Sequence, residues 1–147
     1  PFPTELLDDQ GDLMRKEGNE FGSTTGRARR CGWIDLPALK YSIMINGVSQ
    51  LLMMKADVLS AFPIIKVCTH YRLANGTVTD MVPYEVVREK IIPVYTEMKG
   101  WNISLKGITK DNLPSELNDY IKFLETELRV PITLVSTGPD RTQTILR

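Results

Sequence analysis

Leu51-Leu-Met-Met-Lys-Ala-Asp57 is the stretch of this 147-residue chain that indicates its fold most directly. Its first four residues form an unbroken apolar run, which ends abruptly at Lys55, Ala56 and Asp57. Short apolar runs of this kind are typical of buried parallel strands, because helices cover both faces of such a sheet. We therefore expect an α/β fold with a mixed sheet and flanking helices. An aspartate just beyond such a strand lies where open α/β sheets bind their ligands.

Outward from this stretch, the chain alternates between strand and helix patterns. Apolar patterning predicts further strands at residues 64–72, 77–82, 91–97 and 130–135. It predicts helices at residues 5–16, 36–46 and 113–128. Asp35 can cap the second helix, Pro37 fits its first turn, and Asn46-Gly47 can close it. Asn75-Gly76 favours a two-residue hairpin turn.

The composition argues against several classes of protein. The chain carries 18 Lys and Arg and 18 Asp and Glu, so no global basic field marks a nucleic-acid binder. No apolar run approaches the roughly 20 residues that cross a bilayer. No charged-then-apolar leader indicates secretion, so we expect a cytoplasmic protein without a membrane partner. Cys31, Cys68 and His70 are too few for a disulfide framework or a zinc site, and we expect no metal ligands here.

Lys55-x-Asp57 is the first of three loops that could carry chemistry. An aspartate carboxylate can accept hydrogen bonds from N1–H and the exocyclic amine of guanine, whereas adenine offers no such pair of donors. A bidentate contact of this kind discriminates between bases by about 1–3 kcal/mol. The Lys stem could lie along the base. The alternative is that Asp57 caps the short turn at residues 58–62 and that Lys55 is solvated.

The second loop, Ser136-Thr-Gly-Pro139, also follows an apolar strand directly. Its glycine permits close approach of a flat ligand, and its proline stiffens the wall. An ordinary turn is the alternative. The third loop, Gly22 to Arg30, places glycines around three hydroxyl residues and adds Arg27 and Arg29. Successive backbone N–H groups and planar guanidinium forks suit a carboxylate or phosphate. The alternatives are a solvated basic loop or a weak run similar to a localisation signal.

Other residues are expected to be structural. Trp33 and Trp101 are expected to pack in the core. Glu5, Asp8 and Asp9 are expected to form a solvated face.

With these loops in view, the chain resembles the adenylosuccinate synthetase family. The matching stretches occur in order along the whole chain, and the block from Glu20 to Trp33 is the most specific. The stretches are Pro1-Phe-Pro-Thr-Glu-Leu6, Gly18-Asn-Glu-Phe-Gly-Ser-Thr-Thr-Gly-Arg27, Arg29-Arg-Cys-Gly-Trp33, Lys55-Ala-Asp-Val-Leu59, Pro93-Val-Tyr95, Gly100-Trp101 and Ser136-Thr-Gly-Pro-Asp-Arg141. The chain departs at Met54, Ala56 and Ala28, where the family commonly has Thr, Leu, and Pro or a basic residue.

The resemblance implies a role for each loop. The third loop would bind aspartate through Ser23, Thr24, Thr25, Gly26, Arg27, Ala28 and Arg29. Arg27 would also contact the ribose of inosine monophosphate (IMP), and Arg29 would lie towards GTP. The first two loops would bind GTP through Lys55, Ala56, Asp57, Ser136, Thr137, Gly138 and Pro139.

The resemblance also implies the reaction and its partners. The family phosphorylates the 6-oxygen of IMP with GTP and displaces the phosphate with L-aspartate, giving adenylosuccinate and GDP. Residues 1–147 would be the guanine- and aspartate-binding C-terminal domain of a P-loop-like ligase lacking its N-terminal part. The family's phosphate loop and catalytic Asp and His have no match here, so we expect no catalytic residue, and Mg²⁺ would bind the absent part. The start at Pro1 without Met agrees with a cut piece, inactive alone. The whole enzyme would be a homodimer.

Two other functions stay open at this stage. One is a stand-alone guanine-nucleotide-binding or regulatory module without chemistry. The other is an RNA-contacting domain that uses Arg27 to Arg30, which is disfavoured because only Phe21 and Trp33 offer stacking platforms near that loop. A reading frame that continues upstream into a phosphate-binding loop would favour the ligase over the module.

Overall fold

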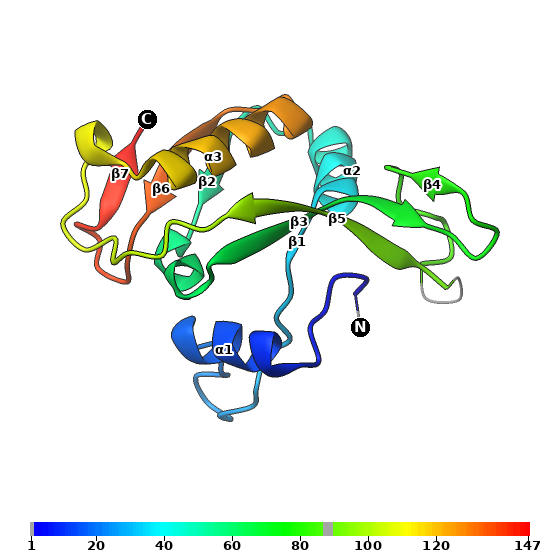
Figure 1. Ribbon diagram of the computed structural model, residues 1–147, viewed down its shortest axis with the longest axis horizontal. Coiled ribbons are helices and arrows are strands. Elements are labelled where there is room, and N and C mark those ends of the chain that lie inside the picture. Colours follow the sequence, from blue (N-terminus) through cyan, green and yellow to red (C-terminus); the bar gives the residue numbers. More distant parts are fainter. Residues whose placement is uncertain (1, 87–89) are drawn as a thin grey trace. The chain divides into compact units, whose positions relative to one another are not determined.

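The computed structural model describes residues 2–86 and 90–147. It divides into two compact units, the first from residues 1–45 and 66–97 and the second from residues 46–65 and 98–147. Each unit contains helices and part of the strand framework (Figure 1).

The first unit is built around a mixed sheet. It contains helices α1 (Asp9–Glu17) and α2 (Leu36–Asn46) and strands β1 (Ile34–Asp35) and β4 (Val78–Thr79), with most of β3 (Ile64–Arg72) and β5 (Ile92–Lys99). Strand β3 pairs with β1 in parallel and with β4 in antiparallel orientation, and it also pairs with β5. The buried residues Val67, Cys68 and Tyr71 of β3 form part of the core.

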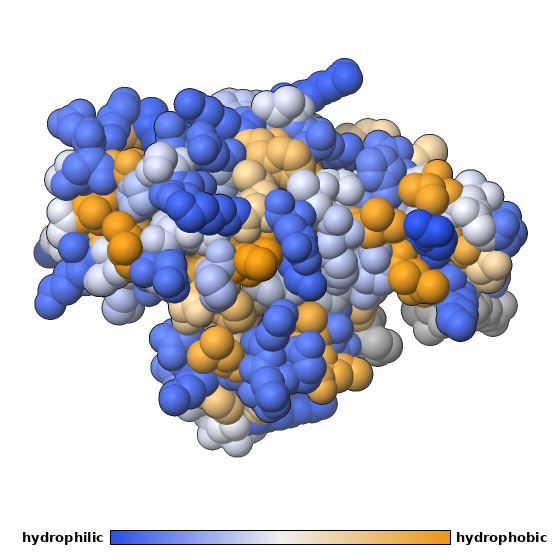
Figure 2. Space-filling view, in the orientation of Figure 1, coloured by the Kyte–Doolittle hydropathy of each residue, from blue (hydrophilic) through white to orange (hydrophobic). Residues whose placement is uncertain are grey.

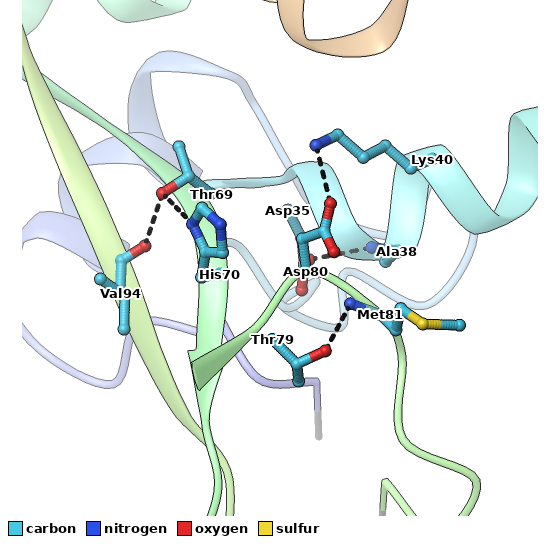
Figure 3. Close-up of polar contacts among 9 residues, drawn as sticks. All are labelled: Asp35, Ala38, Lys40, Thr69, His70, Thr79, Asp80, Met81 and Val94. Carbon is cyan, nitrogen blue, oxygen red and sulfur yellow. Dashed lines mark hydrogen bonds and ion pairs between the residues drawn. The ribbon is translucent and has the colours of Figure 1, made fainter. Parts of the chain in front are cut away.

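Helix α2 begins and ends as its sequence predicts. The Oδ1 atom of Asp35 accepts a hydrogen bond from the N–H of Ala38 at 3.2 Å, which caps the helix (Figure 3). The same oxygen accepts a hydrogen bond from the hydroxyl of buried Tyr71 at 2.6 Å. Gly47 closes the helix with a φ of 60°, a conformation that suits glycine. Lys40, further along the helix, forms an ion pair with Asp80 at 3.3 Å (Figure 3).

The second unit combines a three-stranded sheet with helix α3 (Ser115–Leu128). Strand β6 (Ile132–Ser136) pairs with β2 (Leu51–Met53) in parallel and with β7 (Thr144–Leu146) in antiparallel orientation. Two short 3₁₀ segments, η1 (Ala56–Ala61) and η2 (Lys110–Asn112), complete the unit. Helix α3 runs alongside the sheet (Figure 1). Its apolar stripe is buried at Leu117, Tyr120, Ile121, Leu124 and Leu128.

Several sequence predictions need correction. The predicted strand at 51–54 is parallel, but Leu52 is 56% exposed, so its side chain is not covered by a second layer of the described chain. Strands β1 and β7 were not predicted, because two or three residues carry too little patterning. The strands also fall into two sheets. The predicted two-residue hairpin turn is wrong, since five residues, 73–77, separate the paired Arg72 and Val78.

The predicted solvated face near the start of the chain is also wrong in part. Helix α1 begins at Asp9, because the Asp8 carboxylate caps it by accepting from the N–H of Gly11. The Glu5 side chain is only 12% exposed, and its carboxylate lies 3.5 Å from the guanidinium of Arg30. Trp33 and Trp101 are both buried, as predicted.

Apolar side chains also reach the surface of the first unit. Met44 in α2 and Met81 after β4 are both mostly exposed. Figure 2 shows apolar atoms at the surface over the β4 region.

Cys68 is fully buried, and its burial together with the nearby Asp35 carboxylate raises the pKa of the thiol to about 12. The unfolded chain releases this proton near pH 9.0, whereas the folded chain keeps it. We therefore expect the free energy of unfolding to fall between pH 9 and about 12, by at most about 1.4 kcal/mol per pH unit from this group. Below pH 9 the contribution is complete.

Urea unfolding of the wild type and Cys68→Ala at pH 8, 9 and 10 measures this effect. The wild type should lose more stability than Cys68→Ala over this interval. Equal losses in the two proteins would contradict the assignment of the proton to Cys68.

Candidate functional site

A pocket of about 260 Å³ lies within the second unit. It is lined by Asp57, Ser60, Ser104, Leu105, Lys106, Thr137, Gly138, Pro139 and Gln143. Two of the three predicted loops therefore meet at one cavity. The reason is the parallel pairing of β2 and β6, which brings the carboxyl ends of both strands to the same edge of the sheet.

Asp57 enters the pocket from the first turn of η1. Its Oδ1 atom is buried and has no hydrogen-bond partner within residues 2–86 and 90–147. The capping alternative is wrong, because Lys55 occupies the cap position with a φ of 58° and makes no side-chain cap hydrogen bond. A buried acceptor left without a partner costs roughly 1–3 kcal/mol. A ligand that donates a hydrogen bond to this carboxylate would remove that cost.

Arg29, which the resemblance placed towards GTP, lies in the first unit and does not line this pocket. The other predicted GTP-binding residues lie in the second unit, beside this pocket or at its wall. Lys55 is exposed and Ala56 is buried, and neither side chain is among the groups that line the cavity. Ser136 is buried, and its hydroxyl donates to the carbonyl of Gly138 at 3.0 Å. Ser136 thus shapes the turn, while Thr137, Gly138 and Pro139 face the cavity.

Hydrogen bonds within residues 137–143 hold this turn. The N–H and hydroxyl of Thr137 donate to the carbonyl of Gln143 at 2.9 and 3.3 Å. The side-chain oxygen of Gln143 accepts from the N–H of Asp140 at 2.9 Å. Hydrogen bonds from the N–H and hydroxyl of Thr142 lower the pKa of the Asp140 carboxyl. These hydrogen bonds stabilise the turn that forms the pocket wall.

Gly138 is a glycine because of a close approach. A Cβ at this position would overlap the side-chain amide of Gln143. The overlapping atoms are the far end of the flexible Gln143 side chain, so we expect Gly138→Ala to destabilise the chain by about 1 kcal/mol, mainly through loss of the hydrogen bond from the N–H of Asp140. The double variant Gly138→Ala with Gln143→Ala should lose less than the sum of the single losses, because the shortened residue 143 leaves room for the methyl group. Additive losses in urea unfolding would show that the two side chains do not compete for space.

Five pocket residues were not predicted from the sequence, namely Ser60, Ser104, Leu105, Lys106 and Gln143. The only earlier signal for them was the Gly100-Trp101 pair. The indole N–H of buried Trp101 donates to the hydroxyl of Ser60 at 3.0 Å, and the N–H of Gly100 donates to the carbonyl of Pro63 at 2.9 Å. A Cβ at Gly100 would overlap the carbonyl of Phe62. These contacts direct the following segment, which contains Ser104 and Lys106, to the pocket.

The third predicted loop lies in the first unit and forms a short hairpin. Phe21 and Ala28 form an antiparallel bridge, and the N–H of Gly26 donates to the carbonyl of Gly22 at 2.8 Å. Gly26 has a φ of 64°, which permits the reversal. The side chains from Ser23 to Arg29 are exposed. The hairpin therefore presents the side chains of Ser23, Thr24 and Thr25 to solvent.

The three arginines of this loop differ in their surroundings. The guanidinium of Arg29 donates to the carboxylate of Glu20 at 3.0 Å, and that of Arg30 lies 3.5 Å from Glu5. The carbonyl of Arg29 accepts from Nε of Arg15 at 2.8 Å, which ties the hairpin to α1. The guanidinium of Arg27 is exposed and has no ion pair or hydrogen bond in the described parts of the chain. Arg27 is thus the arginine that is available to an anion.

Nothing in the described chain forms a metal cluster. Among those residues, no group of three or more His, Cys, Asp or Glu side chains could hold a metal ion. His70 lies within β3, where its Nδ1 atom is 3.1 Å from the hydroxyl of Thr69 (Figure 3). No helix within the described ranges is both long and apolar enough to cross a bilayer.

Comparison with known proteins links these features to one family. The family model for adenylosuccinate synthetase matches residues 1–145. The adenylosuccinate synthetases of Cytophaga hutchinsonii and Flavobacterium psychrophilum are 60% and 57% identical to the chain over 148 residues. The match covers all of this chain but only 34% and 35% of those relatives, so the chain spans about a third of their length.

A solved structure agrees. The structure of fully ligated adenylosuccinate synthetase from Plasmodium falciparum matches with a TM-score of 0.92 and 35% sequence identity. It covers 100% of this chain, which corresponds to 36% of the solved chain. Sequence and fold thus lead to the same conclusion: the chain belongs to the adenylosuccinate synthetase family.

Proposed function

We propose that this chain supplies the guanine-binding and aspartate-binding surfaces of a GTP-dependent ligase. The ligase joins L-aspartate to IMP and forms adenylosuccinate, GDP and phosphate. The buried Oδ1 of Asp57, which lacks a partner within the described residues and lies in one pocket with the turn at 137–139, is the observation that carries this proposal. Membership of the adenylosuccinate synthetase family supports it.

In this proposal the second unit selects the nucleotide. The Asp57 carboxylate accepts hydrogen bonds from N1–H and the exocyclic amine of guanine, and Lys55 lies along the base. Ser136 holds the turn, and Gly138 and Pro139 form a close wall for the flat base. Adenine places an acceptor nitrogen at the N1 position, so it would leave the buried carboxylate unpaired, and such a mismatch is rejected strongly.

The first unit would bind the amino acid. Arg27 has a guanidinium without a carboxylate partner in the described chain and can form a bidentate contact with a substrate carboxylate. The hydroxyls of Ser23, Thr24 and Thr25 and their exposed backbone would add donors. Arg29 would lie towards GTP. Magnesium, when bound by the complete ligase, would neutralise charge on the phosphates.

Three broader properties belong to the same proposal. The complete ligase would require Mg²⁺, act as a homodimer and work in the cytoplasm. The observations on this chain that agree with a cytoplasmic enzyme are its balanced charge and its two buried cysteines, which form no disulfide.

A hybrid enzyme tests the proposed function. In this hybrid, residues 1–147 replace the matched 148-residue stretch of the Cytophaga hutchinsonii protein. We expect the folded hybrid to form adenylosuccinate from IMP and aspartate with GTP and not with ATP, as followed by ultraviolet absorbance. A folded hybrid that binds GTP but makes no adenylosuccinate would overturn the ligase assignment in favour of a binding module.

A further inference from the structure

The pocket that contains Asp57 holds a second charged side chain that the proposed function does not use. Lys106 lines the same cavity of about 260 Å³. No ion pair or hydrogen bond involves its ammonium group in the chain as described, although its backbone N–H donates to the hydroxyl of Ser104 at 3.3 Å. One pocket thus contains an anion and a cation that do not satisfy each other.

The two opposite charges complement the polar edges of guanine. The N1–H and exocyclic amine of guanine are donors, and the neighbouring O6 and N7 atoms are acceptors. A base whose donor edge faces Asp57 turns its acceptor edge away from the carboxylate, towards another part of the pocket lining. Lysine is an established partner of the O6 and N7 atoms of guanine. Of the nine residues that line the cavity, Lys106 is the one with a cationic side chain.

Adenine would place an unfavourable group opposite each of the two charges. Its N1 atom is an acceptor and would face the Asp57 carboxylate, and its 6-amino group is a donor and would face the ammonium of Lys106. The two side chains therefore discriminate in the same direction. The Asp57 carboxylate alone would make no contact with the 6-substituent of the purine.

We infer that Lys106 is a second specificity-determining residue of this pocket and that its ammonium group donates to O6 of guanine. This inference rests on the proposed guanine site. Contacts of Gly100 and Trp101 hold the backbone just before the segment that carries Lys106. Because the side chain is exposed, solvent screens the contact and its contribution is modest.

Titration of the chain with GMP and 6-thio-GMP, followed by NMR, tests this role. The two probes carry the same phosphate, and the sulfur is a poorer acceptor than O6. We expect Lys106→Met to raise the Kd for GMP about fivefold, which corresponds to the lower end of base-contact energies. The same variant should bind GMP and 6-thio-GMP with more nearly equal affinity than the wild type does. Lys106→Arg should keep the preference for GMP, since arginine also binds O6.

Lys110→Met is the matched control. Lys110 lies four residues further along the chain and does not line this pocket. Its replacement by Met removes the same charge as Lys106→Met. We expect it to leave both Kd values unchanged. If Lys106→Met leaves the Kd for GMP unchanged, or raises both Kd values by the same factor, the contact with O6 does not exist. If the wild type and Asp57→Asn each bind GMP and AMP equally, the guanine site itself does not exist. Failure of the Lys106 contact is thereby distinguishable from failure of the proposed guanine site.

Discussion

Asp57→Asn in the hybrid enzyme should reduce kcat/KM for GTP by roughly tenfold to a hundredfold and improve the use of xanthosine triphosphate. The amide keeps the shape of the carboxylate but turns one acceptor into a donor. That donor faces the exocyclic amine of guanine and repels it, whereas xanthine has a carbonyl at this position and accepts the hydrogen bond. The structural reason for the large effect is that Oδ1 is buried and has no partner in the described chain to replace the lost contact.

The exposed residue Asp119 of α3 provides the control. Asp119→Asn makes the same change of charge in the same unit, and it should leave the kinetics with both nucleotides as in the wild type. Unchanged GTP kinetics in Asp57→Asn would mean that this carboxylate does not read the base.

Arg27→Leu should lower kcat/KM for aspartate by roughly a hundredfold or more while the protein stays folded. Charge-assisted hydrogen bonds contribute about 1.5–3 kcal/mol each, and loss of a bidentate pair removes two of them. The fold should persist because the Arg27 side chain is exposed and makes no contact that holds the hairpin. Initial rates at varied aspartate and a circular dichroism spectrum give both quantities.

Two further variants sharpen this experiment. Arg27→Lys keeps the charge but loses the planar fork, and it should recover only part of the efficiency. Arg72→Leu removes an exposed arginine elsewhere in the first unit and should have no effect on aspartate kinetics. A normal KM for aspartate together with a normal kcat in Arg27→Leu would end the assignment of Arg27 to the substrate.

The sequence predicted those parts of the fold that depend on local patterning. Strand β3 was predicted with its observed bounds, and the Asp35 cap and the Gly47 end of α2 were correct. The apolar stripe of α3 was predicted because Leu117, Ile121, Leu124 and Leu128 repeat at helical spacing, although Leu113 of the same pattern lies before the helix and Tyr120 was not predicted. The resemblance to the adenylosuccinate synthetase family is confirmed by the match over residues 1–145.

The features of the fold that were not predicted correctly have a common physical reason. Each of them depends on contacts with residues that are distant in the sequence. Strand β7 is recognisable only through its pairing with β6. The exposure of Leu52 depends on what covers β2, and local patterning does not contain that information. Likewise, the pairing of Glu5 with Arg30 joins residues 25 positions apart.

The candidate site shows the same division. Asp57 and the turn at 137–139 were found because both follow apolar strands, and the structure brings them to one pocket. Lys106 and Gln143 carry no motif of their own, so only the folded chain reveals them as pocket residues. The roles of Ser23 to Arg29 and of Lys55 in binding substrates stay predictions.

The most direct measurement of the guanine site is an NMR titration of the chain labelled at the aspartate carboxyl carbons. On addition of GMP, we predict a shift of the Asp57 Cγ signal and of the amides of Thr137 and Gly138, with no comparable change on addition of AMP. Equal responses to both nucleotides, or an Asp57 signal that does not move while GMP binds elsewhere, would contradict the account.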